Sequence, residues 1–201
     1  MIVNKDYKGL KNVGWRYELK GDLISDEDIK IELDMNLYVS GSTEAGWGIT
    51  AGCGIEAGWG ITAGDGIEAG CGIEAGWGIT AGDGIEAGWG ITAGDGITAG
   101  CGIEAGDGIE AGWGITAGDG ITAGLTITAK WLDIGLRIFA GLCLWKIPSE
   151  EKTMINVEEI KNGEVCYGKL NILKPKEIKE MTISEISKEL GYDIKVVKEN
   201  E

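Results

Sequence analysis

The amino-acid sequence predicts an all-β protein: a three-sided β-solenoid (β-helix) with about 18 residues per coil, followed by a small α+β C-terminal module. A hexapeptide, Ile-(Thr/Glu)-Ala-Gly-(Trp/Asp/Cys)-Gly, repeats almost without error between residues 43 and 124. A short period of this kind is typical of a solenoid whose strands stack coil on coil. Aliphatic residues continue the frame on both sides, and the composition changes after Pro148. These observations divide the chain into residues 1–21, 22–147 and 148–201.

The N-terminal segment, residues 1–21, is predicted to form a short cap or a strand pair. Next come two hexads, residues 31–36 and 37–42, that keep aliphatic residues at the Ile and Ala positions. Their larger side chains predict an N-terminal coil with a fuller core. The apolar residues of the first segment, which lie among polar ones, are Tyr7, Leu10, Val13, Trp15, Tyr17 and Leu19.

Downstream of the perfect repeats the frame continues and then slips. Trp131 is in frame with the earlier tryptophans, but Ile138 follows Ile121 one position earlier than three full hexads would place it. The residues up to 147 that follow the slip are rich in Leu and Ile. They predict an apolar end of the solenoid that needs covering.

Within one hexad, strand alternation places Ile and Ala on the same side and Thr or Glu on the other. We therefore expect Ile and Ala to point inward and Thr or Glu to face solvent. The glycine after Ala is expected to adopt a positive φ and turn the corner. The variable residue, which is Trp, Asp or Cys, follows at that corner and is expected to be partly exposed.

Two hexads or three could complete one coil, and the charges distinguish the two arrangements. Stacked residues lie only ~4.8 Å apart. A coil of two hexads would stack Asp83, Asp95, Asp107 and Asp119 in an uninterrupted column, which is unfavourable without a bound cation. A coil of three hexads leaves only Asp65 and Asp83 adjacent, and it also separates Thr from Glu. The sequence therefore favours the three-sided coil.

The three-sided arrangement predicts two kinds of surface. One face is nearly neutral and carries Thr62, Thr80, Thr98 and Thr116 beside Trp59, Trp77, Trp113 and Trp131. The other two faces are acidic and carry Glu56, Asp65, Glu68, Glu74, Asp83, Glu86, Glu104, Asp107, Glu110 and Asp119. An exposed line of aromatic residues often marks an interface, although the rings can also lie flat over the glycines and cover the backbone.

The C-terminal module, residues 148–201, is predicted to contain a hairpin, a helix and a strand. Met154–Val157 and residues 165–167 flank an Asn-Gly pair that is typical of a hairpin turn. A capping-box pattern at Thr182 opens a short helix that ends at Leu190, and a strand follows at 193–197.

Charge limits the partners that the chain can bind. The formal net charge is −15, and residues 44–124 hold seven Glu, five Asp and no Lys or Arg, which is −12. The flanking segments are nearly neutral. Such a body repels nucleic acid and anionic membranes, and it attracts basic proteins. Twelve charges over ~22 Å give one per ~1.8 Å, against one per ~1.7 Å of duplex DNA.

The composition also argues against a catalytic or metal-binding function. The chain has no histidine, the commonest general base and transition-metal ligand. Its five cysteines show no CxxC spacing, and we see no signal segment or membrane span. We therefore expect a cytoplasmic, non-enzymatic protein with no catalytic, metal or cofactor site, and free thiols.

Three stretches of the chain carry a resemblance: the repeated Gly-Ile-Glu-Ala-Gly-Trp-Gly-Ile-Thr-Ala-Gly, residues 136–143 and residues 164–168. Together they resemble a family of uncharacterised bacteriophage and prophage proteins of Gram-positive bacteria. The resemblance implies no activity and gives no residue a role, but it implies a location in the host cytoplasm. The coil is also loosely similar to bactofilins, which form polymers. Two less favoured alternatives are an ice-binding solenoid and a hexapeptide acyltransferase, whose usual pattern and catalytic histidine this chain lacks.

Two functional hypotheses remain. The first is an acidic, DNA-mimic-like accessory protein that inhibits a host nucleic-acid-binding or defence protein. The second is a self-assembling scaffold or homodimer that pairs through the Thr/Trp face.

Overall fold

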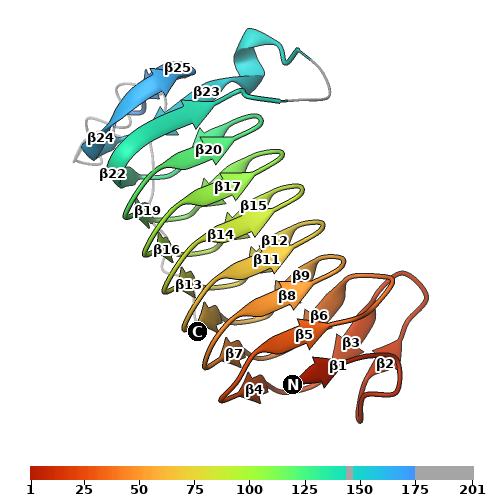
Figure 1. Cartoon of the computed structure of the whole chain (residues 1–201). Helices are drawn as coiled ribbons and strands as arrows, with labels where there is room; N and C mark the ends of the chain where they lie inside the picture. Colours follow the sequence, from red (N-terminus) through yellow and green to blue (C-terminus); the bar gives the residue numbers. More distant parts are fainter. Residues whose placement is uncertain (144–146, 175–201) are drawn as a thin grey trace, which may run out of the picture.

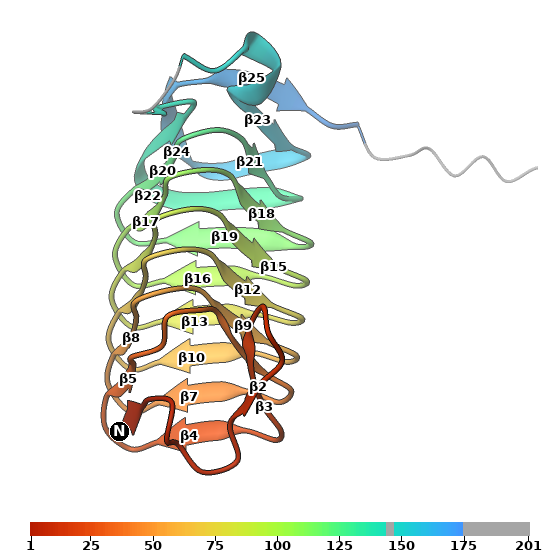
Figure 2. The same cartoon turned by 90° about the vertical axis from the view of Figure 1, so that its right-hand side faces the viewer.

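The alternation of each hexad builds one short strand and one side of a solenoid. In β13 (Ile79–Ala81), Ile79 is fully buried, Ala81 is buried, and Thr80 between them is exposed. The computed structural model describes residues 1–143 and 147–174. These residues form a parallel β-solenoid, seen along its side in Figure 1 and turned by 90° in Figure 2. Its interior is a continuous stack of Ile and Ala side chains.

Parallel pairing between consecutive coils confirms the coil of three hexads. Thr62 pairs with Thr80, Glu68 pairs with Glu86, and Ile73 pairs with Ile91, so each residue meets the one three hexads later. The Thr/Trp face contains β4 (Leu23–Ser25), β7 (Thr43–Ala45), β10 (Ile61–Ala63), β13, β16 (Ile97–Ala99) and β19 (Gly114–Ala117).

The two acidic faces differ from each other, so we name them separately. The Glu-ladder face contains β1 (Ile2–Val3), β5 (Ile29–Ile31), β8 (Ile49–Ala51), β11 (Ile67–Ala69), β14 (Ile85–Ala87), β17 (Ile103–Ala105) and β20 (Ile121–Ala123). The mixed face contains β3 (Tyr17–Leu19), β6 (Leu37–Val39), β9 (Ile55–Ala57), β12 (Ile73–Ala75), β15 (Ile91–Ala93), β18 (Ile109–Ala111) and β21 (Ile127–Thr128).

The first coil is longer than the others, so the predicted frame of residues 31–36 is wrong. Leu23 pairs with Thr43 and Ile29 pairs with Ile49, in each case two positions beyond three hexads. Ile29 therefore holds the Ile position, and Ile31 holds the Ala position. The two additional residues lie between β5 and β6, because from β6 onward the spacing is three hexads.

The N-terminal segment supplies strands to the stack as well as a cover. β1 pairs in parallel with β5, and β2 (Lys11–Asn12) pairs antiparallel with β3. β3 then pairs in parallel with β6 as the first strand of the mixed face. Met1, Tyr7 and Leu10 pack against the core. The N-terminal end of the solenoid is thereby closed by its own chain.

One long strand, β22 (Trp131–Ala140), spans two faces near the C-terminal end. Ile115 pairs with Leu132, and Ile121 pairs with Ile138, so this coil is one residue shorter than three hexads. The missing residue lies before Trp131, which pairs with Gly114 and not with Trp113. The prediction that Trp131 is in frame with the tryptophan column is therefore wrong.

The predicted C-terminal hairpin is also wrong. β23 (Met154–Val157) pairs in parallel with β21 and with β25 (Lys169–Ile172), while β24 (Glu159–Tyr167) pairs in parallel with β22. Parallel stacking buries Ile155 and Val157 on the apolar end of the solenoid. A separate hairpin would leave the apolar end of the solenoid exposed to solvent. Gly163 has a φ of 111° and lies at an irregularity of β24 rather than in a hairpin turn.

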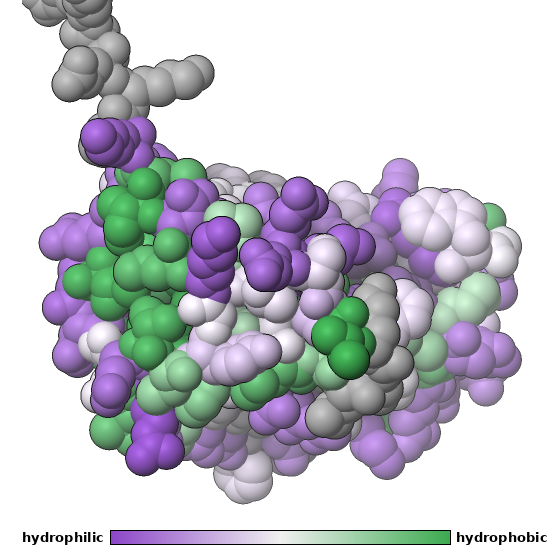
Figure 3. Space-filling model, turned by 90° about the horizontal axis from the view of Figure 1, so that it is seen from above, coloured by the Kyte–Doolittle hydropathy of each residue, from purple (hydrophilic) through white to green (hydrophobic). Residues whose placement is uncertain are grey.

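The described part of the chain contains no α-helix, only the short 3-10 turn η1 (Glu150–Lys152). The helix expected from Thr182 to Leu190 and the strand expected at 193–197 lie outside the described residues. Figure 3 looks down on the C-terminal end of the solenoid, where apolar residues gather on one side. Three exposed apolar residues at the end of the described chain are Leu170, Ile172 and Leu173.

Close approach of stacked coils, and not a positive φ, explains the glycine after each alanine. Among the described residues, no glycine between positions 43 and 124 has a positive φ, so that expectation is wrong. Instead, a Cβ atom at Gly82 would overlap the carbonyl oxygen of Gly64 in the coil before. Glycine is required here because it brings no side chain into the space between two corners.

Thr43 occupies an inward Ile position, and its buried hydroxyl has no hydrogen-bond partner. It stacks between Leu23 and Ile61. We expect Thr43→Val to raise the free energy of unfolding by about 1 kcal/mol, because it removes an unsatisfied polar group at nearly constant volume. Urea unfolding measures the change. Thr62→Val is the control, because Thr62 lies on the exposed side of β10, the strand that pairs with β7. If Thr43→Val destabilised the protein, the Thr43 hydroxyl would have a hydrogen-bond partner after all.

Candidate functional site

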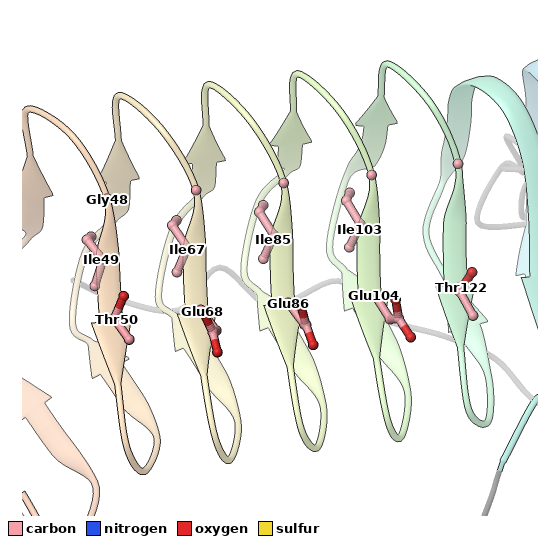
Figure 4. Close-up of a pocket in the computed structure, with 14 residues that line it drawn as sticks. Gly48, Ile49, Thr50, Ile67, Glu68, Ile85, Glu86, Ile103, Glu104 and Thr122 are labelled. Atoms are coloured by element: carbon pink, nitrogen blue, oxygen red, sulfur yellow. The ribbon is translucent and has the colours of Figure 1, made fainter. Parts of the chain in front are cut away.

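Three consecutive strands of the Glu-ladder face present glutamates in register. Glu68 of β11 pairs with Glu86 of β14, and Glu86 pairs with Glu104 of β17. All three side chains are exposed and point away from the core, as Figure 4 shows. Because adjacent strands lie ~4.8 Å apart, the three carboxylates form a ladder of like charge along the solenoid axis.

The ladder lies in a shallow groove of ≈ 610 Å³. The groove extends over five coils, from Thr50 at one end to Thr122 at the other. From Ile49 to Ile121, a glycine stands before each inward isoleucine of this face, and these positions have no side chain to fill the surface. The glycines that line the groove are Gly48, Gly66, Gly84, Gly102 and Gly120.

Aspartates add charge along one edge of the groove. Asp65 and Asp83 occupy the corner between the Thr/Trp face and the Glu-ladder face, and the Asp83 amide donates to the Asp65 carbonyl at 3.3 Å. Asp119 belongs to the same corner two coils later, after Cys101. We call these three aspartates together with the Glu68, Glu86 and Glu104 ladder the acidic groove.

Within the described residues, no Lys or Arg side chain forms an ion pair with a carboxylate of the acidic groove. The four ion pairs found there all involve residues 5–56, in the first coils. Between Lys30 and Lys130 the sequence contains neither Lys nor Arg. The six carboxylates therefore face solvent with an unbalanced negative potential, which attracts cations and basic surfaces.

The mixed face is less acidic than the sequence suggests. The Arg16 guanidinium pairs with Glu56 and with Glu18, each at 2.8 Å, and lies over the rings of Trp15 and Tyr38. The Glu56 side chain is only 23% exposed. The charge of Glu56 is therefore paired, and the ion pair links the N-terminal segment to the solenoid. Arg16 was not recognisable as its partner, because the two lie 40 residues apart in the chain.

The remaining acids of the mixed face do not form a ladder. Glu74 stacks between Glu56 and Thr92, and Glu110 stacks between Thr92 and Thr128. Asp107 lies at a corner of the same region and is partly buried. Of the two predicted acidic faces, only the Glu-ladder face brings three glutamates together.

The Thr/Trp face combines an uncharged ladder with a short aromatic stack. Thr62, Thr80, Thr98 and Thr116 pair in register. At the neighbouring corner the rings of Trp59 and Trp77 stack at 5.7 Å with an interplanar angle of 8°. They remain 54% and 61% exposed.

The aromatic row does not continue to Trp131. Asp95 interrupts it, and at Trp113 the Lys130 ammonium lies 3.7 Å from the ring centroid. The Trp131 ring covers Gly114, where a Cβ atom would overlap it, and the Lys161 ammonium lies 3.6 Å from its centroid. Trp131 is therefore partly buried and covers backbone. The shortened spacing between Ile121 and Ile138 was the signal that could have shown this.

Other kinds of site find no support in the described residues. No three His, Cys, Asp or Glu side chains there come together in an arrangement that could hold a metal ion. None of the helical segments described is long and apolar enough to cross a membrane. Comparison with protein-family models, with curated proteins and with solved structures finds no match for this chain.

Proposed function

We propose that this chain is a non-enzymatic binding protein whose acidic groove engages a basic, nucleic-acid-binding surface of a protein partner. The observation that carries the proposal is the uncompensated ladder of Glu68, Glu86 and Glu104, edged by aspartates. The ladder glutamates lie on strands that are paired on both sides. A rigid arrangement of this kind loses little conformational entropy when it binds.

Charge spacing supports a comparison with nucleic acid. The six carboxylates of the acidic groove lie in four consecutive coils, separated by three steps or ~14 Å, which gives one charge per ~2.4 Å. This spacing lies between the one charge per ~1.7 Å of duplex DNA and the one per ~3.4 Å of a single strand. A surface lined with Lys and Arg would therefore meet a similar charge density in the groove. The resemblance to phage proteins makes a host defence protein in the host cytoplasm the partner that we propose.

The groove can be tested with a fluorescent oligolysine peptide and fluorescence anisotropy. The variant replaces Glu68, Glu86 and Glu104 with Thr, the residue that this face already carries at Thr50 and Thr122. We expect binding at low salt to weaken on the order of tenfold or more, which corresponds to ~1.4 kcal/mol or more. Binding by the unmodified protein should also weaken as salt rises.

A control variant with the same net charge separates the groove from general acidity. It replaces Glu44, Glu74 and Glu110 with Thr, on the other two faces. We expect a much smaller loss of affinity than in the ladder variant. Equal losses in the two variants would reject the groove as the binding site. Displacement of a basic DNA-binding domain from duplex DNA by the unmodified protein, but not by the ladder variant, would support mimicry.

A homodimer through the Thr/Trp face is the second candidate function. The stacked pair of Trp59 and Trp77 favours it, because each of the two tryptophans is more than half exposed to solvent. A second copy can also approach the Thr ladder without meeting a ladder of carboxylates. The face extends over ~24 Å and is ~20 Å wide, so pairing would bury about 1,000 Å² in total, near the lower limit for a specific interface.

The dimer is tested by mass in solution. Replacing Trp59, Trp77 and Trp113 with Ser is expected to convert a dimer to a monomer in light scattering. Trp89→Ser is the control, because Trp89 is equally exposed at the corner between the other two faces. An unmodified protein that is already monomeric would reject this candidate.

A further inference from the structure

Two cysteines are stacked at one corner of consecutive coils. Cys53 follows β8, Cys71 follows β11, and the Cys71 amide points to the Cys53 carbonyl oxygen at 3.5 Å. Both thiols are free and partly buried. The next residues in this corner column are Trp89 and Asp107. This is the one corner column of the described coils in which two cysteines are adjacent.

The separation of the two residues suits a disulfide. Stacked residues lie ~4.8 Å apart, and the Cα atoms of a disulfide are separated by roughly 4.4–6.8 Å. The Cβ atoms of a disulfide lie ~3.5–4.5 Å apart, so the two corners must approach each other slightly. Both residues lie in bends between strands, where such a shift does not break the strand pairing.

We propose that Cys53 and Cys71 form a reversible disulfide that links two consecutive coils when the protein meets a low-molecular-weight disulfide oxidant. A bridge that needs a small shift of the backbone is more easily reduced than an unstrained one. It would therefore respond to the redox state of its surroundings. The inference is independent of what the acidic groove binds.

The exchange proceeds in two balanced steps. The Cys71 thiolate attacks one sulfur of oxidised glutathione, so the glutathione S–S bond breaks, a mixed disulfide forms, and the released thiolate takes a proton. The Cys53 thiolate then attacks the Cys71 sulfur and releases the second glutathione thiol. Two protein thiols are oxidised, and one small disulfide is reduced to two thiols.

The order of attack follows from the surroundings of Cys53. Burial, and next the neighbouring Cys71, raise the pKa of the Cys53 thiol. Because the thiolate is the nucleophile, a raised pKa makes Cys53 the poorer first attacker. Its closeness to Cys71 still suits it to resolve the mixed disulfide.

The experiment treats the folded, full-length protein with oxidised glutathione, blocks the remaining thiols by alkylation, and maps the peptides by mass spectrometry. A protease that cleaves after Glu and Asp is needed, because no Lys or Arg lies between Lys30 and Lys130. Cleavage at Glu56, Asp65 and Glu68 separates the two cysteines. We expect a linked pair of peptides that contains Cys53 and Cys71 and that dithiothreitol releases.

Two serine variants complete the test. Cys101→Ser should leave the linked peptides unchanged, because Cys101 is exposed at another corner. Cys71→Ser should abolish them. The proposal is overturned if Cys53 and Cys71 of the folded protein both stay free and are then alkylated, if each carries its own glutathione, or if links to Cys101 are equally abundant.

Discussion

Gly82→Ala is expected to lower the free energy of unfolding by about 3 kcal/mol or more, a large effect for one methyl group. The added Cβ would meet the Gly64 carbonyl oxygen of the preceding coil. That oxygen is backbone and cannot move aside as a flexible side chain can. The two coils would have to separate, and the Gly82 amide would weaken its hydrogen bond to the Ala63 carbonyl, now 3.1 Å long.

Gly52→Ala is the matched control, because Gly52 occupies the same position in its hexad. The longer first coil leaves more room beneath it, and a Cβ there would lie 3.8 Å from the Leu33 carbonyl oxygen. We expect a change of no more than ~0.5 kcal/mol. Urea unfolding of the two variants gives the comparison. Similar losses in both would mean that conformational freedom, and not contact between coils, requires glycine at this position.

Replacing Glu68, Glu86 and Glu104 with Thr is expected to raise the free energy of unfolding by about 1–2 kcal/mol at low salt, for two reasons. The two stacked pairs of like charge each cost roughly 0.2–1 kcal/mol, and Thr also suits a strand better than Glu. The same substitutions are expected to weaken binding to a basic probe. The ladder would then be a feature that costs stability and serves recognition.

Glu110→Thr separates charge repulsion from strand preference. Glu110 stacks between Thr92 and Thr128 and has no carboxylate directly above or below it. Its replacement should change stability by less than ~0.5 kcal/mol. The gain in the ladder variant should also shrink in high salt, because salt screens exposed charges. A gain that is the same at low and high salt would contradict the role of repulsion.

The repeated part of the fold could be predicted because the residue pattern within each hexad is enough to determine its strand. Ile and Ala at alternate positions determine which side of a strand is buried. The cost of stacking Asp83, Asp95, Asp107 and Asp119 indicated three hexads per coil, and the observed pairing agrees. The location of the Glu68, Glu86 and Glu104 ladder followed directly from that register.

The one-residue slip at Ile138 could be predicted from the spacing, and the observed pairing confirms it. The other departures from regularity could not be predicted, because they depend on contacts between distant segments. The additional residues of the first coil become visible only when Leu23 is paired with Thr43. The neutralisation of Glu56 requires Arg16 to return from the N-terminal segment. The C-terminal strands stack in parallel because the apolar end of the solenoid is there to receive Ile155. The Asn-Gly pair is a local turn signal and carries no information about that apolar end.

The equivalence of the three sides has a consequence for insertions and deletions. Removing three consecutive hexads from the regular part would shorten the rod by one coil and leave every later side chain on its own side. Removing a single hexad would preserve the buried Ile and Ala pattern equally well. However, it would rotate everything downstream by one third of a turn, so that threonines would continue a column of glutamates. The same backbone can therefore carry a permuted pattern of surface charge, and a single hexad is the smallest unit by which that pattern changes.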